Sequence, residues 1–143
     1  MNQDEIAARI AILDLTSRFA EAADNKDAEA YASLFAPDAR FEPGPIGTMQ
    51  GRDAVREFIR GLPPDVPRTW HQMTSFRVDY LGDGRAVGCV YYLALTEAGI
   101  DHWGRYEDEY CEVDGRWLFQ VRLCRIEAFA PGSLMEQLVK KPE

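Results

Sequence analysis

The fold class of this chain is decided by the stretch RAVGCVYYLALT, residues 85–96. Most of its positions are β-branched, aromatic or small apolar residues, which is typical of a strand. Both alternating sets of positions are apolar, so neither face of the predicted strand suits water. We therefore expect helices to cover one face of its sheet and a second subunit to cover the other.

Further strands are predicted on both sides of this stretch, at residues 69–81, 102–113 and 117–129. The connecting segments carry turn residues: Gly82-Asp-Gly84, Ala98-Gly-Ile100 and Asp114-Gly115. The last of these is a strong hairpin signal, because Asp-Gly readily adopts a two-residue turn. The second half of the chain is thus predicted to form an antiparallel meander.

A long helix is predicted at residues 6–23, which contain no glycine or proline. Ile6, Ile10 and Leu13 recur at helical spacing, and we expect this face to be buried. Other apolar residues lie on the opposite side, so most of the helix surface should be covered.

Shorter elements follow from capping residues and breakers. Asp27 can cap a second helix that runs to residues 34–35, and Ser133 can cap a last helical turn ending at Lys140-Lys141. Other segments are predicted as a short strand at 39–43, a return at 48–50 and a third helix at 52–62. The order of helices followed by strands predicts an α+β fold, and a strongly curved sheet would leave a conical cavity.

Length and composition favour one domain spanning residues 1–143, with the tail at 131–143 as a candidate lid or interface segment. The net charge is −8 and the 16 Lys and Arg are scattered, which argues against a nucleic-acid partner. No apolar run approaches the roughly 20 residues of a membrane span, and the acidic N-terminus is unlike a signal peptide, so we expect no membrane partner and a cytoplasmic location. The three cysteines show no zinc or disulfide spacing, and we expect no metal and no cofactor.

Asp24 and His71 are the candidate catalytic pair. Asp24 lies 14 residues after Ile10, close to four helical turns, so it should continue the same face near a helix C-terminus, where the dipole disfavours a carboxylate. A hydrogen bond from His71 would offset this cost. An aspartate that accepts from one imidazole nitrogen fixes the tautomer and prepares the other nitrogen as a base. An ordinary polar turn at residues 24–27 and a structural strand histidine are the alternatives.

Six segments of the chain resemble a known family. They are FAEAADNKD at 19–27, LFAPDA at 34–39, GRDAV at 51–55, TWH at 69–71, GRYEDEY at 104–110 and DGRW at 114–117. Together they resemble the SnoaL-like branch of the nuclear transport factor 2-like superfamily, which includes scytalone dehydratase, hexachlorocyclohexane dehydrochlorinase and bile-acid 7-alpha-dehydratase. The resemblance implies a cone-shaped, mostly antiparallel curved sheet wrapped around three N-terminal helices and enclosing one pocket. In the eliminating members an Asp–His base dyad occupies positions that match Asp24 and His71.

The chain departs from those enzymes near the dyad. They place a Tyr or Lys one turn before the aspartate, or a Tyr directly before it, whereas this chain has Phe19 and Ala23. Another donor must then stabilise developing negative charge. The candidates are Tyr31, Tyr91, Tyr92, Tyr106, Arg122 and Arg125.

Tyr106 and Arg125 are the favoured pocket groups, with Arg122 as a rival. Cross-strand packing is the alternative for Tyr106, and an ion pair with Glu127 or Glu112 is the alternative for Arg125. His102 begins a strand near a loop, and a solvated rim position is expected for it.

An apolar wall would suit a small, ring-shaped organic ligand. The predicted substrate-binding residues are Tyr106, Arg125, Arg122, Trp70, Phe41, Phe19, Phe58, Met73 and Tyr91. Any single apolar member of this set has a plain core position as its alternative.

The function expected from these features is that of a cofactor-independent lyase, dehydratase-like, or an isomerase that uses the Asp24–His71 dyad on a small cyclic substrate. The alternative is a non-catalytic binding protein or an accessory subunit similar to the small subunit of ring-hydroxylating dioxygenases. A third hypothesis, in which a carboxylate is itself the base as in ketosteroid isomerase, ranks lower because no second aspartate is clearly placed as donor. A homodimer or homotrimer formed through the sheet is expected.

Overall fold

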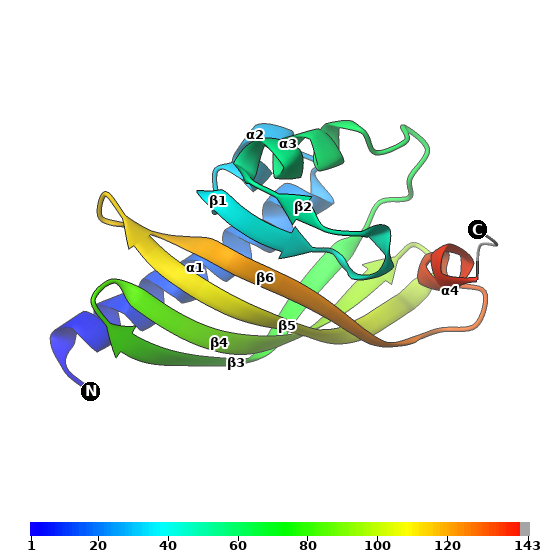
Figure 1. Cartoon of the computed structure of the whole chain (residues 1–143). Helices are drawn as coiled ribbons and strands as arrows, with labels where there is room; N and C mark the ends of the chain where they lie inside the picture. Colours follow the sequence, from blue (N-terminus) through cyan, green and yellow to red (C-terminus); the bar gives the residue numbers. More distant parts are fainter. Residues whose placement is uncertain (141–143) are drawn as a thin grey trace.

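The structure, a computed structural model, describes residues 1–140 (Figure 1). Its helices are α1 (Gln3–Asp24), α2 (Ala28–Ala32), α3 (Arg52–Arg60) and α4 (Leu134–Val139), with a short 3-10 helix η1 (Gly44–Ile46). Its strands are β1 (Phe35–Glu42), β2 (Met49–Gln50), β3 (Trp70–Gly82), β4 (Arg85–Thr96), β5 (Gly99–Val113) and β6 (Arg116–Phe129). The predicted helix end at Lys140-Lys141 lies partly outside the described residues.

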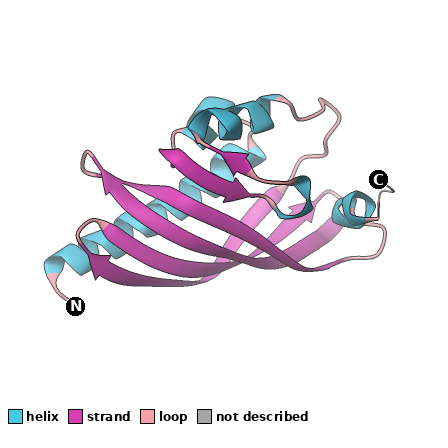
Figure 2. Cartoon of the chain, viewed as in Figure 1, coloured by secondary structure: helices cyan, strands magenta, loops and turns pink. Residues whose placement is uncertain are grey.

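The strands form one curved sheet in the order β2-β1-β6-β5-β4-β3. Among the described residues, β1 and β6 are the only strands that pair in parallel, and the other neighbours are antiparallel. Helix α1 runs along the concave side, while α2 and α3 cover β1 and β2 (Figures 1 and 2). The predicted α+β class and curved, mostly antiparallel sheet are confirmed. No helix within residues 1–140 is both long and apolar enough to cross a membrane.

Aromatic side chains form the core between α1 and the sheet. Phe19 of α1 lies within 4.9–6.3 Å, between ring centroids, of five rings: Tyr31, Phe35, Phe41, Tyr106 and Phe119. Such tilted and edge-on pairs add about 0.5–1.5 kcal/mol each beyond the area they bury. This cluster fixes which face of α1 meets the sheet.

The predicted buried face of α1 is wrong. Ile10 is 65% exposed, and Ile6 and Leu13 are also exposed, whereas Ile12 and Leu15 are buried with Phe19. The helix carries apolar residues nearly all round, so periodicity could not choose between its faces. Phe19 decides, because its ring contacts the aromatic side chains of β1, β5 and β6.

Several boundaries also differ from expectation: α1 begins at Gln3, α3 ends at Arg60 and β5 begins at Gly99, and the junction of α2 and β1 changes most. Strand β1 begins at Phe35 rather than at residue 39, and α2 ends earlier, at Ala32. Phe35 pairs with Phe119 of β6 in the parallel ladder, and this long-range pairing ends the helix. The caps were predicted: the side chains of Asp27 and Ser133 accept hydrogen bonds from the first turns of α2 and α4.

Candidate functional site

The candidate site lies at one end of the concave face, where β3, β4 and β5 bring the side chains of His71, Tyr92 and His102 together. Strand pairing aligns His71 with Ala94, and Ala94 with His102. Because adjacent strands lie about 4.8 Å apart, the two histidine Cα atoms are on the order of 10 Å apart. Tyr92, two residues before Ala94, has its ring centroid 6.2 Å from that of His71 and 5.6 Å from that of His102. The Tyr92 ring therefore lies between the His71 and His102 imidazoles and is close to both.

Asp24 holds His71 through several hydrogen bonds. Its Oδ1 lies 2.6 Å from His71 Nδ1, and both carboxylate oxygens accept from the His71 backbone N–H at 3.1 Å. The Thr69 hydroxyl donates to Oδ1 at 3.3 Å. The side chains of His71 and Asp24 are 16% and 12% exposed, so the pair is screened from water but remains accessible.

The contact joins residues 47 positions apart, and local structure explains it. Asp24 is the last residue of α1, and His71 is the second residue of β3. Lys26, in the left-handed region at φ 52°, donates to the Val66 carbonyl at 2.6 Å and thereby ties the turn after α1 to the segment before β3. The donors on β3 offset the unfavourable position of a carboxylate at a helix C-terminus.

A second Asp–His pair lies on β5, and sequence reasoning missed it. Asp101 Oδ2 is 2.8 Å from His102 Nδ1, and their side chains are only 4% and 10% exposed. The predicted rim position of His102 is therefore wrong. Burial lowers the pKa of His102, while its hydrogen bond to Asp101 opposes this shift.

A β-bulge explains how neighbouring residues can both turn inward. His102 pairs with Ala94 and Ile100 pairs with Leu95, so Asp101 is the extra residue between two ladder positions. Bulges redirect side chains that would otherwise alternate between faces. The dipeptide Asp101-His102 was the only signal in the sequence, and regular alternation along a strand would place two neighbouring residues on opposite faces.

Tyr92 is the one candidate donor that lies beside His71. Its hydroxyl is 3.3 Å from Cys124 Sγ, and burial raises the Tyr92 pKa far above its ordinary value, so the hydroxyl stays protonated. Tyr106 lies behind Tyr92 in the core, with its ring centroid 4.6 Å from that of Tyr92. Tyr31 packs against Phe19 in the core.

Arg122 lies deeper still and is fully buried. Its guanidinium carbon is 3.8–4.2 Å from the ring centroids of Tyr106, Phe19 and Phe119, and its Nε is 3.4 Å from Asp108 Oδ1. None of its three nitrogens has a hydrogen-bond partner among residues 1–140. Burial raises the pKa of Asp108 to about 6, against the opposing effect of Arg122.

Three predicted pocket residues point away from the concave face. Arg125 is exposed and pairs with Glu107, a partner that was not foreseen. Tyr91 is 43% exposed, and Trp70 is 37% exposed with the Arg68 guanidinium against its ring. Each lies next to an inward-facing residue along its strand, and the pleat places it on the opposite face. Their predicted role as pocket residues is corrected accordingly.

The remaining apolar candidates belong to the core. Phe19 and Phe41 are fully packed, and Phe58 and Met73 are partly buried against the same cluster. Met73 pairs with Tyr92 across β3 and β4 and lies two residues after His71 on the same strand.

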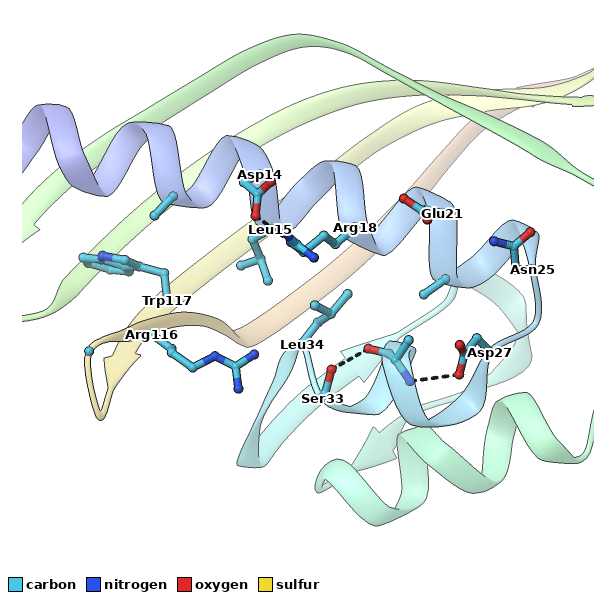
Figure 3. Close-up of a pocket in the computed structure, with 14 residues that line it drawn as sticks. Asp14, Leu15, Arg18, Glu21, Asn25, Asp27, Ser33, Leu34, Arg116 and Trp117 are labelled. Atoms are coloured by element: carbon cyan, nitrogen blue, oxygen red, sulfur yellow. Dashed lines mark hydrogen bonds and ion pairs between the residues drawn. The ribbon is translucent and has the colours of Figure 1, made fainter.

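A wide groove lies elsewhere on the molecule. It has a volume of about 490 Å³ and is bordered by α1, by α2 with the residues at both of its ends, and by the β5–β6 turn, as Figure 3 shows. Asp14 and Arg18 on its α1 side form an ion pair, and Trp117 stands at its far end. Neither Asp24 nor His71 lines this groove. Among residues 1–140, no three His, Cys, Asp or Glu side chains gather as a metal site.

The chemical capacity of the site follows from its tautomers. A carboxylate at Nδ1 favours the proton on that nitrogen and leaves Nε2 as a proton acceptor. Both histidines have this arrangement, and Tyr92 adds a neutral donor. The residues therefore suit proton transfer to and from a bound organic molecule.

Solved structures of similar shape carry related names. The hexachlorocyclohexane dehydrochlorinase of Novosphingobium barchaimii LL02 is 26% identical, with 90% of this chain and 92% of that chain covered and a TM-score of 0.79. A provisionally assigned scytalone dehydratase from Novosphingobium aromaticivorans is 24% identical, covers 91% of both chains and has a TM-score of 0.82. The beta subunit of an aromatic-ring-hydroxylating dioxygenase, also provisionally assigned and from the same organism, is 15% identical, with 93% and 97% covered and a TM-score of 0.77. The last two likenesses support the fold alone.

A family model described as the SnoaL-like domain matches residues 4–122, a range that includes both Asp–His pairs. The chain therefore belongs to the SnoaL-like family and has the nuclear transport factor 2-like cone fold.

Proposed function

We propose that this protein is a cofactor-independent lyase, dehydratase-like, or an isomerase, with His71 as the base and Asp24 as the residue that orients it. The observation that carries this proposal is that the Asp24 carboxylate is hydrogen-bonded to both the backbone N–H and Nδ1 of His71. An aspartate with a purely structural role needs only some of these hydrogen bonds. A histidine that acts as a base needs its ring held in one orientation, with Nε2 toward the substrate.

In the proposed elimination, Nε2 of His71 takes a proton from a carbon next to a carbonyl or a leaving group. The electrons of the broken C–H bond form the new double bond as the leaving group departs with its electron pair. The protonated imidazole can then give its proton to a departing hydroxide. In an isomerisation the same proton returns to another carbon. Tyr92 and His102, on the two neighbouring strands, are the proposed groups that bind the substrate's oxygen atoms.

The proposed substrate is a small cyclic organic molecule. Tyr92 and Met73 supply apolar surface beside the imidazoles, which suits one ring. The name of the dehydrochlorinase that is 26% identical, which acts on hexachlorocyclohexane, supports the same class.

Turnover of a panel of cyclic β-hydroxy ketones by wild type, His71→Ala and Asp24→Asn tests this function. Loss of turnover in both variants is expected. Gln72→Ala is the matched control, since Gln72 is exposed and neighbours His71 on β3, and it should keep wild-type rates. Equal turnover by His71→Ala and wild type, with the fold intact by circular dichroism, would remove His71 from the mechanism.

The same preparation tests the alternative of a binding protein or an accessory subunit. A ligand retained after purification, with no turnover of any panel member, would favour a binding protein. A chain that is stable only when a large partner is co-expressed would favour the subunit.

We also propose that the convex face of the sheet forms a contact with a second copy of the chain. Ile100, Trp103 and Tyr91 are exposed there and border a largely apolar groove of about 330 Å³. Exposed apolar patches of this kind mark interfaces. Light scattering should show a dimer or trimer for wild type and a smaller species for Trp103→Glu. A monomeric wild type would overturn this contact.

A further inference from the structure

One carboxylate joins the C-terminal helix to the second histidine. Asp101 Oδ1 accepts a hydrogen bond from the Leu134 backbone N–H at 2.7 Å, and Oδ2 accepts from that of Met135 at 3.1 Å. The same Oδ2 lies 2.8 Å from His102 Nδ1. The first turn of α4 and the His102 ring therefore share a single anion.

The burial of Asp101 favours this sharing. Its side chain is almost fully buried, and a buried carboxylate is costly unless donors satisfy it. Within residues 1–140 its hydrogen-bond donors come from only two sources, the backbone of α4 and the imidazole. When α4 leaves, two of the three donors are lost and water can reach the carboxylate. The hydrogen bond that orients His102 then has to compete with water.

Helix α4 also borders a groove beside β6. A groove of about 400 Å³ is lined by Val139 of α4, by Gly44 and Pro45 of the η1 segment, and by Cys124 of β6. Cys124 in turn contacts the Tyr92 hydroxyl, and the Tyr92 ring neighbours both imidazoles. Movement of α4 would widen this groove next to Cys124, and mobile lids of this kind open binding sites in other enzymes.

We infer that Asp101 is a positioning residue that couples the docking of α4 to the orientation of the His102 imidazole. When α4 is docked, all three hydrogen bonds to the Asp101 carboxylate are made, and the proton of the His102 ring is held on Nδ1. Undocked α4 leaves the imidazole free to rotate and to exchange tautomers. This inference rests on the proposed function, because it takes the concave face beside His71 and His102 as the reaction site.

The sharpest test removes one N–H group from α4. Leu134 is the first residue of the helix, where proline is tolerated, and Ser133 has the extended backbone (φ −70°, ψ 163°) that a following proline requires. Leu134→Pro deletes the donor to Asp101 Oδ1, and Leu134→Ala is the matched control that shortens the side chain but keeps the N–H. In ¹⁵N spectra of the histidine rings, we expect the His102 signals to move from the Nδ1–H tautomer toward an average in Leu134→Pro only. The His71 signals should stay unchanged in both variants.

Coupling must be reciprocal, so the second test starts from the histidine. His102→Phe keeps a ring but removes Nδ1, and His71→Phe is the control on the other pair. Hydrogen exchange of the α4 amides should become several-fold faster in His102→Phe and remain at the wild-type rate in His71→Phe. Identical His102 spectra for the proline and alanine variants, or unchanged α4 exchange in His102→Phe, would overturn the coupling.

Neither measurement needs a substrate. Absence of turnover would therefore remove the proposed function while leaving the link between α4 and His102 in place. Unchanged spectra and exchange rates would remove the link while leaving His71 as the proposed base.

Discussion

The two Asp–His pairs share their chemistry and differ in how the fold holds them. Asp24 and His71 come from distant segments, and their side chains remain 12% and 16% exposed at the end of α1. Asp101 and His102 are neighbours on one strand, brought together by a bulge and enclosed by α4. The comparison suggests different duties: an accessible imidazole suits a base that meets the substrate, and an enclosed one suits a group whose state depends on closure.

The largest expected difference between the two Asp–His pairs is in the fall of kcat when each histidine is substituted. General-base catalysis contributes on the order of 10²–10⁴-fold, so His71→Gln should lower kcat by that range. His102→Gln should lower it by only about 10-fold, the expected effect of losing one binding group. Steady-state rates on the same cyclic ketone check both values. A larger loss in His102→Gln would reverse the assignment of the base.

For stability we expect the opposite order: substitution of Asp101 should lower the free energy of unfolding more than substitution of Asp24. Asp101→Ala leaves two helix N–H groups and one imidazole without their shared acceptor, and we expect a loss of about 2–3 kcal/mol in the free energy of unfolding. Asp24→Ala should lose about 1–2 kcal/mol, because removing a carboxylate from a helix C-terminus gives back about 0.3–1 kcal/mol. Urea unfolding of the two variants at one pH gives the difference, which equal losses would contradict.

Asp108 must be separated from both pairs in any pH series. Its pKa is about 6 in the folded protein and near 3.8 in the unfolded chain, so the folded state binds more protons between these values. Its contribution to stability is therefore complete below pH 4 and lost as the pH rises through 6, by an amount on the order of 3 kcal/mol. Between pH 4 and pH 7 the wild type should lose stability relative to Asp108→Asn. A constant difference would show that Asp108 does not titrate in this range.

The smallest expected effect belongs to His102. Burial lowers its pKa in the folded protein, so the unfolded chain binds more protons as the pH falls below the ordinary value of 6.5. Stability should accordingly decrease as the pH falls below 6.5, and His102→Gln should remove part of this decrease. Thermal unfolding of the two proteins between pH 5 and pH 7 measures it. A steeper decrease in the variant would contradict the assignment.

Much of the fold was predictable because its signals are local. The bounds of β4 follow from its composition and flanking turns, and the caps at Asp27 and Ser133 follow from their residue types. The contact between Asp24 and His71 was expected from an awkward carboxylate and a resemblance to a family. Its premise was faulty, since Ile10, which served as the reference for the buried face, is exposed.

The inward or outward direction of strand residues was harder to predict. Arg125, Tyr91 and Trp70 were placed in the pocket on residue type, and the pleat directs them to the convex face. Asp101 was not considered at all, because a period of two forbids two inward neighbours and the bulge was invisible before the strands were paired.

Residue order and composition thus determined by themselves the class of fold, the position of most elements and a short list containing the first Asp–His pair. Only the folded chain decided which face of α1 is buried, that Asp101 and His102 form a second pair, and that α4 binds to it. The physical reason is range: propensities, caps and turns act over a few residues. The register between strands, the bulge and the burial of a shared carboxylate depend instead on segments that meet only after folding.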